Sequence, residues 1–386
     1  MCAPRGEVSP SLRGSERSRR NPYGDTRLAI QPIVSGDIRM IHRFLISIGV
    51  LIALPLASAT LPVAGQTPAS AAKPARTAKA YAPPRTRDGR PDLQGVWDYR
   101  TITPLERPAA LGERQFFTDQ EAANFEKEEN RRQNRDLIDS AKGGVQYPPG
   151  GVVPYNEFWY DRGDKVTASR RTSLIVDPPD GRLPPRTADG QKRAEARAAA
   201  QREDQYGRPK ADSYEDRPLP ERCILGFNAG PPMLPGAYNN NFQLFQTAGY
   251  VVIHTEMVHD ARLVPLDGRP HGKIRQWLGD SRGRWEGDTL VIDTTNFLRE
   301  TSLAGSSANM HLVERFTRVD ADTLLYEFTV EDPSTWTKPW TAQLSMKKSQ
   351  EPIFEYACHE VNYAMLSMLA GARAQDKAAE DAGKKD

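Results

Sequence analysis

The densest group of chemically capable side chains lies in the segment HTEMVHD, from His254 to Asp260. Imidazole and carboxylate groups transfer protons near neutral pH, because the ordinary pKa of histidine is about 6.5. Side chains two residues apart on a strand lie on the same face, so we expect His254 and Glu256 to share one pocket. His259 and Asp260 follow at the turn. We therefore predict His254, Glu256, His259 and Asp260 as the catalytic residues of an acid–base site.

Two other interpretations of this group stay open. His254 and Glu256 could form a structural hydrogen-bonded pair on a half-buried strand. Together with His259 they also make a plausible set of metal ligands. The helical zinc signature H-E-x-x-H is absent, because the spacing here is H-x-E-x-x-H. We predict no cofactor and no metal, with a divalent metal as the alternative.

Several nearby residues suit the binding of a polar ligand. Asn239, Asn240 and Asn241 precede a predicted strand, and their amides can donate and accept hydrogen bonds, as sugar or hydroxyl recognition requires. A turn that uses the tolerance of asparagine for positive φ is the alternative. Arg222 and Arg262 offer guanidinium groups that fit a carboxylate or phosphate. A buried ion pair is the alternative for Arg222.

An export signal is predicted over residues 40–59. The basic start Met40-Ile41-His42-Arg43 precedes an apolar run from Phe44 to Ala57, which is shorter than the roughly 20 residues of a membrane helix. Ala57-Ser58-Ala59 offers a cleavage site. We expect a periplasmic or secreted protein, with an uncleaved anchor as the alternative. Residues 1–39 are interpreted as an extension upstream of a true start at Met40.

Two of the three cysteines, Cys223 and Cys358, lie outside this leader. In an exported chain two cysteines most simply form a disulfide. That bond would bring Arg222 close to His359 and Glu360, since each of these segments adjoins one cysteine. We predict Arg222, His359 and Glu360 as a second group of ligand-binding residues. A structural polar cluster around the disulfide is the alternative.

Composition divides the rest of the chain. Residues 60–87 read as a flexible linker, 88–373 as a single β-rich domain, and 374–386 as a disordered charged tail. The formal net charge is only +2, and no basic stripe is interleaved with aromatic residues, so we expect no nucleic-acid partner. A small molecule is the expected partner, without stable membrane insertion after signal cleavage. The oligomeric state stays open.

From Phe242 onward, short apolar segments alternate with turn residues. Asp267-Gly268 is the strongest turn signal and predicts a hairpin between residues 261–266 and 273–278. The pattern lacks βαβ alternation, so we predict a mainly β fold: an antiparallel β-barrel of the lipocalin or calycin type with short helical and loop insertions. Further hairpin turns are expected at 286–288 and 320–322, and helices over 118–141 and 188–200. The first of these helices is expected to begin with a capping box, since Glu121 follows Thr118 by three residues.

Glu314 and Glu327 lie on two consecutive predicted strands. Glu327 alternates with Tyr326 and Phe328, which places it on the opposite face from those aromatic residues. We expect both glutamates to face solvent, with an interior polar site as the alternative.

Motifs along the whole mature chain resemble a family of exported proteins from proteobacteria and acidobacteria. They are DLQGVW (92–97), TPLERP (103–108), LPERC (219–223), GDSRGRWEGDTLVIDTTNF (279–297), ERFTRVDADTLLYEFTVEDP (314–333) and YACHEVNY (356–363). This resemblance implies no particular activity. The hairpin at 311–330 is also similar to lipocalin-related barrels, which bind small apolar or amphipathic ligands, and that similarity concerns the fold alone.

We therefore expect an exported enzyme that performs acid–base chemistry of the lyase, isomerase or hydrolase type on a small aromatic or polyhydroxylated molecule. The concentration of ionisable residues in 219–297 favours an enzyme. A non-catalytic periplasmic barrel that binds a small ligand is the alternative. In the enzyme, His254 acts as acid or base with Glu256 or Asp260 as its partner, and Arg222, Asn240 and His359 hold the substrate.

Overall fold

The structure is a computed structural model that describes residues 81–137, 156–200, 211–301, 303–360 and 362–383. The predicted upstream extension (1–39), the predicted signal (40–59) and most of the predicted linker (60–80) lie outside the described residues.

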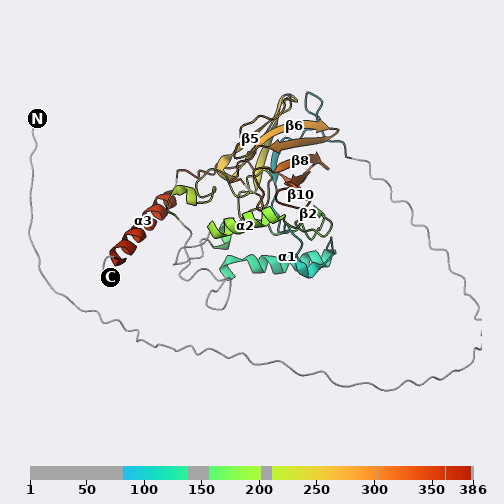
Figure 1. The fold of residues 1–386 in the computed structure, drawn as a ribbon. Coiled ribbons are helices and arrows are strands. Elements are labelled where there is room, and N and C mark those ends of the chain that lie inside the picture. Colours follow the sequence, from blue (N-terminus) through green and yellow to red (C-terminus); the bar gives the residue numbers. More distant parts are fainter. Residues whose placement is uncertain (1–80, 138–155, 201–210, 302, 361, 384–386) are drawn as a thin grey trace, which may run out of the picture. The chain divides into compact units, whose positions relative to one another are not determined.

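Within this part of the chain, ten strands form one antiparallel sheet (Figure 1). The strand order is β5-β4-β3-β1-β10-β9-β8-β7-β6, and β2 pairs with β10. The bounds are β1 Gly95–Asp98, β2 Ile175–Asp177, β3 Asn241–Gln246, β4 Tyr250–Thr255, β5 Ala261–Pro265, β6 Asp280–Glu286, β7 Thr289–Thr295, β8 His311–Arg318, β9 Thr323–Glu331 and β10 Trp340–Ser349. The prediction of a mainly β, antiparallel fold is confirmed.

The two ends of this order, β5 and β6, approach each other. A Cβ atom added to Gly283 of β6 would lie 2.8 Å from Val264 Cγ1 and 2.6 Å from Leu266 Cδ2. Among the described residues, however, no ladder of hydrogen bonds joins β5 to β6. The sheet is therefore not closed, and the predicted barrel is confirmed only as far as the antiparallel sheet.

The hairpin predicted at Asp267-Gly268 is wrong. β5 pairs with β4, and the next strand begins only at Asp280. In between, Gln276 forms an isolated parallel bridge with Phe297. Turn chemistry is local, whereas the partner of a strand depends on which apolar faces meet, so a strong turn signal did not decide the pairing.

The interior face of the sheet is filled by large side chains. Every second residue of β8 and β9 is buried, as expected for strands with one face in a core. Fully buried aromatic residues come from several strands and from the segments beside them: Trp97, Tyr99, Phe242, Phe316, Tyr326, Phe328, Trp336 and Trp340. The interior is thus a packed core.

Charged residues also lie inside this core, and Glu314 is the most deeply buried of those on β8 and β9. Glu314 is 0% exposed and shares its face with Leu312 and Phe316. The expectation that Glu314 faces solvent is therefore wrong, because the alternation of β8 places it on the apolar side. Glu327, on the other face of β9, is partly exposed and accepts a hydrogen bond from Gln343 Nε2 at 2.6 Å.

Three α-helices occur among the described residues: α1 Asp119–Gln133, α2 Ala188–Ala200 and α3 Tyr363–Gly383. Thr118 begins α1 with a capping box to Glu121, as its sequence predicts. Helix α3 includes residues 374–383 of the predicted charged tail, where alanine, lysine and glutamate favour a helix. None of the described helices has the length and apolar character to cross a membrane. Short 3₁₀ turns are η1 Ala109–Leu111, η2 Arg135–Leu137, η4 Glu157–Trp159, η5 Tyr214–Asp216 and η6 Met257–His259.

Candidate functional site

The predicted pairing of His254 with Glu256 on one strand face is not present. β4 ends at Thr255, and Glu256 has helical backbone angles. The Glu256 side chain is buried, where it accepts hydrogen bonds from Asn241 Nδ2 at 2.9 Å and from the backbone N–H of Phe354 at 3.1 Å. Glu256 thus fastens the segment around Phe354 to the end of the sheet.

The corner between β4 and β5 still gathers several unusual features. The His254 and His259 rings meet edge to face, with centroids 4.3 Å apart. Burial, followed by the proximity of His259, lowers the pKa of His254, so its imidazole is neutral at pH 7 and able to accept a proton. Val258 and His259 both have φ of 58°, a rare and strained state for a β-branched residue such as valine. Asp260 Oδ2 is buried without a hydrogen-bond partner among the described residues, and burial raises the pKa of this carboxyl.

The asparagine triplet has mainly structural contacts. The buried Asn240 amide donates hydrogen bonds to the carbonyls of Asp161 at 2.8 Å and Gly236 at 3.2 Å. Asn239 has φ of 55°, the left-handed conformation that asparagine tolerates. The Asn241 amide donates a hydrogen bond to the Glu256 carboxylate. Asn239 therefore has the turn conformation given above as the alternative to ligand binding. Asn240 uses its amide to hold the surrounding loops together.

Arg262 lies in the core. Its Nη1 and Nη2 atoms donate to both oxygens of Glu314, at 2.5 and 3.0 Å. The Tyr326 hydroxyl also donates to Glu314, at 2.7 Å, and accepts a hydrogen bond from the backbone N–H of Met233. Burial and the adjacent Glu314 raise the pKa of Tyr326. The guanidinium of Arg262 is thus engaged by the protein itself.

The predicted disulfide between Cys223 and Cys358 is present. It brings together the two segments that the sequence singled out, because Arg222 and His359 line one cavity of about 430 Å³. The Arg222 guanidinium lies over the Tyr214 ring, 5.3 Å from its centroid. Glu360 is exposed and does not line this cavity.

A larger cleft of about 670 Å³ lies on the other side of Arg222. This volume falls within the range of about 300–1,000 Å³ that is usual for small-molecule sites. Its wall is formed by residues 215–222, 225–227, 230–232 and 234, together with residues 197, 300, 301 and 303. Four of these residues carry carboxylates: Glu215, Asp216, Glu221 and Glu300. Its apolar lining includes Leu219, Leu225, Phe227, Leu234 and Leu303.

Two polar groups in this cleft have no partner within the described residues. The half-buried Arg222 forms no ion pair with a described carboxylate, and its guanidinium lies over the Tyr214 ring. The hydroxyl oxygen of Thr301 is buried and makes no described hydrogen bond. A buried hydroxyl without a partner is costly, so Thr301 is suited to bind a polar atom of a ligand. The Arg222 guanidinium is only half-buried, and its N–H groups can donate to an anion.

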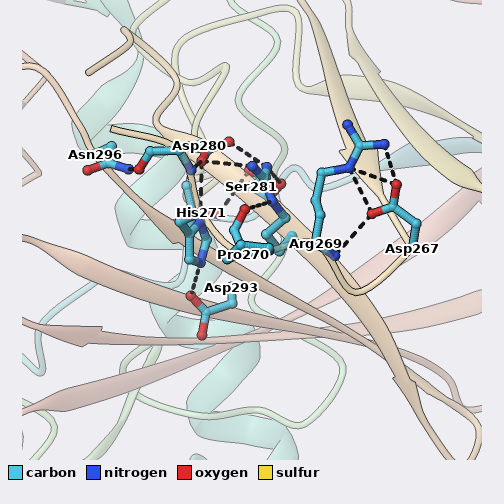
Figure 2. A network of polar contacts seen from close by, with 11 residues as sticks. Asp267, Arg269, Pro270, His271, Asp280, Ser281, Asp293 and Asn296 are labelled. Carbon is cyan, nitrogen blue, oxygen red and sulfur yellow. Dashed lines mark hydrogen bonds and ion pairs between the residues drawn. The ribbon is translucent and has the colours of Figure 1, made fainter. Parts of the chain in front are cut away.

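A third arrangement was not predicted from the sequence. Asp293 on β7 binds two histidines, His271 Nε2 at 2.9 Å and His311 Nε2 at 3.0 Å. The remaining ring nitrogens face carboxylates as well: His271 Nδ1 is 3.6 Å from Asp280 Oδ2, and His311 Nδ1 is 3.4 Å from Glu331 Oε2. Figure 2 shows His271 between Asp280 and Asp293. Carboxylates and imidazoles therefore alternate in one chain of five residues, here called the His–Asp chain.

Each charge in the His–Asp chain affects its neighbour. The hydrogen bond from His311 lowers the pKa of Asp293, and the same bond raises the pKa of His311. The chain also holds the loop between β5 and β6 in place, because Asp280 accepts a hydrogen bond from the backbone N–H of Gly272 at 2.6 Å. Neither cavity is lined by these residues. The described contacts of these residues hold the loop between β5 and β6 to the outer face of the sheet.

No protein-family model, curated protein or solved structure matches this chain. The family resemblance based on sequence motifs therefore stays a prediction. Within the described part of the chain, no group of three His, Cys, Asp or Glu side chains is arranged to hold a metal ion. The function has to be inferred from the cleft, from Arg222 and from the β4–β5 corner.

Proposed function

We propose that this chain is an exported protein that binds a small organic anion with an apolar or aromatic body in the cleft beside Arg222. The observation that carries the proposal is a guanidinium without a described carboxylate partner at the edge of a cleft of about 670 Å³ that has apolar side chains along part of its wall. The Cys223–Cys358 disulfide supports an exported location, because such bonds persist in oxidising compartments.

The chemistry of the cleft fits such a ligand. A guanidinium can bind both oxygens of a carboxylate or two oxygens of a phosphate, which fixes the position of the anion. Leucine and proline side chains along the wall would bury the apolar body, with a gain of about 25 cal/mol for each Å² removed from water. The Thr301 hydroxyl would provide a further hydrogen bond.

We further propose that the sheet is a barrel-like scaffold of the lipocalin or calycin type. Instead of a hydrogen-bonded ladder between β5 and β6, the side chains of Val264 and Leu266 would pack against Gly283. The ligand would bind at loops outside the sheet, since buried aromatic residues fill the interior. This location differs from that in lipocalins, which enclose a ligand inside the barrel.

The second candidate is the acid–base enzyme predicted from the sequence. It is favoured by the β4–β5 corner, where His254 has a lowered pKa and the backbone at Val258 is strained. Met257 at this corner packs in one apolar cluster with Leu225, which also lines the cleft. A substrate in the cleft would thus lie next to the element that carries His259.

Isothermal titration of the mature protein with phenylacetate tests the binding proposal. We expect the wild type to bind phenylacetate and Arg222→Gln to bind it at least about tenfold more weakly. The neutral amide phenylacetamide should bind the wild type more weakly than phenylacetate does, by a similar factor. Arg182→Gln is the matched control, because Arg182 is exposed and lines neither cavity. Equal affinity of the wild type and Arg222→Gln for phenylacetate would overturn the proposal.

Mass spectrometry of small-molecule extracts distinguishes the enzyme from the binding protein. Consumption of a compound by the wild type but not by His254→Ala would establish turnover and give the mass change of the reaction. Retention of one unchanged compound by both proteins would exclude a catalytic role of His254 toward that compound.

A further inference from the structure

The two cavities are separated by one short stretch of chain. Arg222 lines both of them. Beyond it, Ile224 lines the smaller cavity and Leu225 lines the larger one. Residues 222–225 therefore form a partition, with an apolar side chain toward each cavity and the guanidinium at the junction.

Both cavities have apolar side chains in their walls beside this shared cation, and the larger one is also lined by Glu215, Asp216, Glu221 and Glu300. The larger has Leu219, Leu225 and Leu234 in its lining. The smaller has Ile224 together with Met365 and Leu366 from the first turn of α3. Each cavity can thus bury an apolar group of its own while the same charge is within reach.

The partition is held in place from two sides. Cys223 follows Arg222 and is bonded to Cys358, which fixes the backbone beside the guanidinium. The ring of Tyr214 lies under the guanidinium, at 5.3 Å. Because an aromatic ring contacts the face of a guanidinium, the N–H groups at its edge stay available for an anion.

We propose that the ligand has one anionic centre flanked by two apolar arms, with the anion on Arg222 and one arm in each cavity. This inference rests on the proposed function, because it requires that Arg222 binds an anion. It adds the shape of the ligand. A single-armed anion would fill only one cavity, whereas a branched acid or a diester of phosphoric acid would fill both.

Two probes with the same charge test the shape. Phenylacetate carries one phenyl arm on its carboxylate-bearing carbon, and diphenylacetate carries two. We expect diphenylacetate to bind the wild type at least about tenfold more tightly in isothermal titration, because a second ring is buried. Arg222→Gln should weaken both probes, and Arg182→Gln should weaken neither.

Variants of the smaller cavity locate the second arm. Leu366→Ser is chosen because the Leu366 side chain is 70% exposed, so its loss does not threaten the fold. In this variant, and in Ile224→Ser, the ratio of the two affinities should fall toward one. Circular dichroism checks that both variants are folded.

The other outcomes separate the two proposals. Equal binding of both probes, lost in Arg222→Gln, would overturn the two-armed ligand and leave the anion site intact. A preference for diphenylacetate that survives both cavity variants would also overturn it, since both rings would then lie in the larger cavity. Binding of neither probe would overturn both proposals.

Discussion

Arg262 on β5 and Glu314 on β8 form a buried, bidentate ion pair, although these strands are not neighbours in the sheet. Their side chains are 8% and 0% exposed. The pair therefore crosses the interior of the sheet and links a strand at one end of the order to a strand near the other end. Tyr326 completes the hydrogen bonding of the carboxylate.

We expect Glu314→Leu to lower the free energy of unfolding by about 3–5 kcal/mol, because it leaves the Arg262 guanidinium buried without a counter-charge. The double variant Arg262→Met with Glu314→Leu should recover most of that loss, since no unpaired charge remains. Urea denaturation measures both. A double variant no more stable than Glu314→Leu would contradict this assignment of the cost to the unpaired charge.

The disulfide should contribute strongly to stability, because Cys223 and Cys358 are 135 residues apart in sequence. The chain-entropy model gives a loss of about 5 kcal/mol when the bond is removed from a loop of this length. We expect Cys223→Ser with Cys358→Ser to show a loss of this order in urea denaturation. A reductant should destabilise the wild type alone. An equal effect of the reductant on the variant would show that it acts elsewhere.

The His311–Asp293 pair should stabilise the fold most at mildly acidic pH. The raised pKa of His311 contributes stability that is complete below the unfolded pKa of about 6.5 and is lost as pH rises through the higher folded pKa. The lowered pKa of Asp293 contributes stability that is present above its unfolded value of about 3.9 and is lost as pH falls through the lower folded pKa.

We therefore expect the difference in stability between the wild type and His311→Gln to be greatest near about pH 5 and to shrink toward about pH 8. For such a partly exposed pair its size should be about 1 kcal/mol or less. Thermal denaturation at several pH values measures it. A difference that grows with pH would disprove the ion pair.

His254 should titrate below the ordinary histidine value of about 6.5, because burial and the neighbouring His259 both disfavour its charged form. Nuclear magnetic resonance of the imidazole carbons measures this directly. His259→Gln should raise the pKa of His254 only part of the way, since the burial remains. A wild-type value at or above about 6.5 would contradict the packing of the two rings.

Local chemistry in the sequence predicted part of this structure. The capping box at Thr118 is predicted by four consecutive residues. The disulfide is predicted by the two cysteines outside the leader together with the export signal. Alternation predicted the strands of the hairpin at 320–322, which β8 and β9 confirm. The polarity of Glu314 predicts an exposed side chain, whereas its spacing from Leu312 and Phe316 predicts a buried one. The partner that makes burial possible, Arg262, is 52 residues away in sequence, so local patterns do not reveal it.

The His–Asp chain shows why the rest could not be predicted. His271 lies in a loop, and His311 begins β8. They meet at Asp293 only because β7 pairs with β8 in one particular register and the loop folds over the sheet. Alternation places Asp293 on the face opposite Ile292, which is the one signal that pointed to an outward carboxylate.

Because aromatic side chains fill the core, a ligand can bind and dissociate without any opening of the sheet. A protein that stores its ligand inside a barrel has to loosen that barrel for entry and release. Here both cavities lie outside the core cluster of buried residues. A ligand should therefore enter and leave while amide hydrogens of β8 and β9 stay protected from exchange, and its residence time should depend on the loops around Arg222.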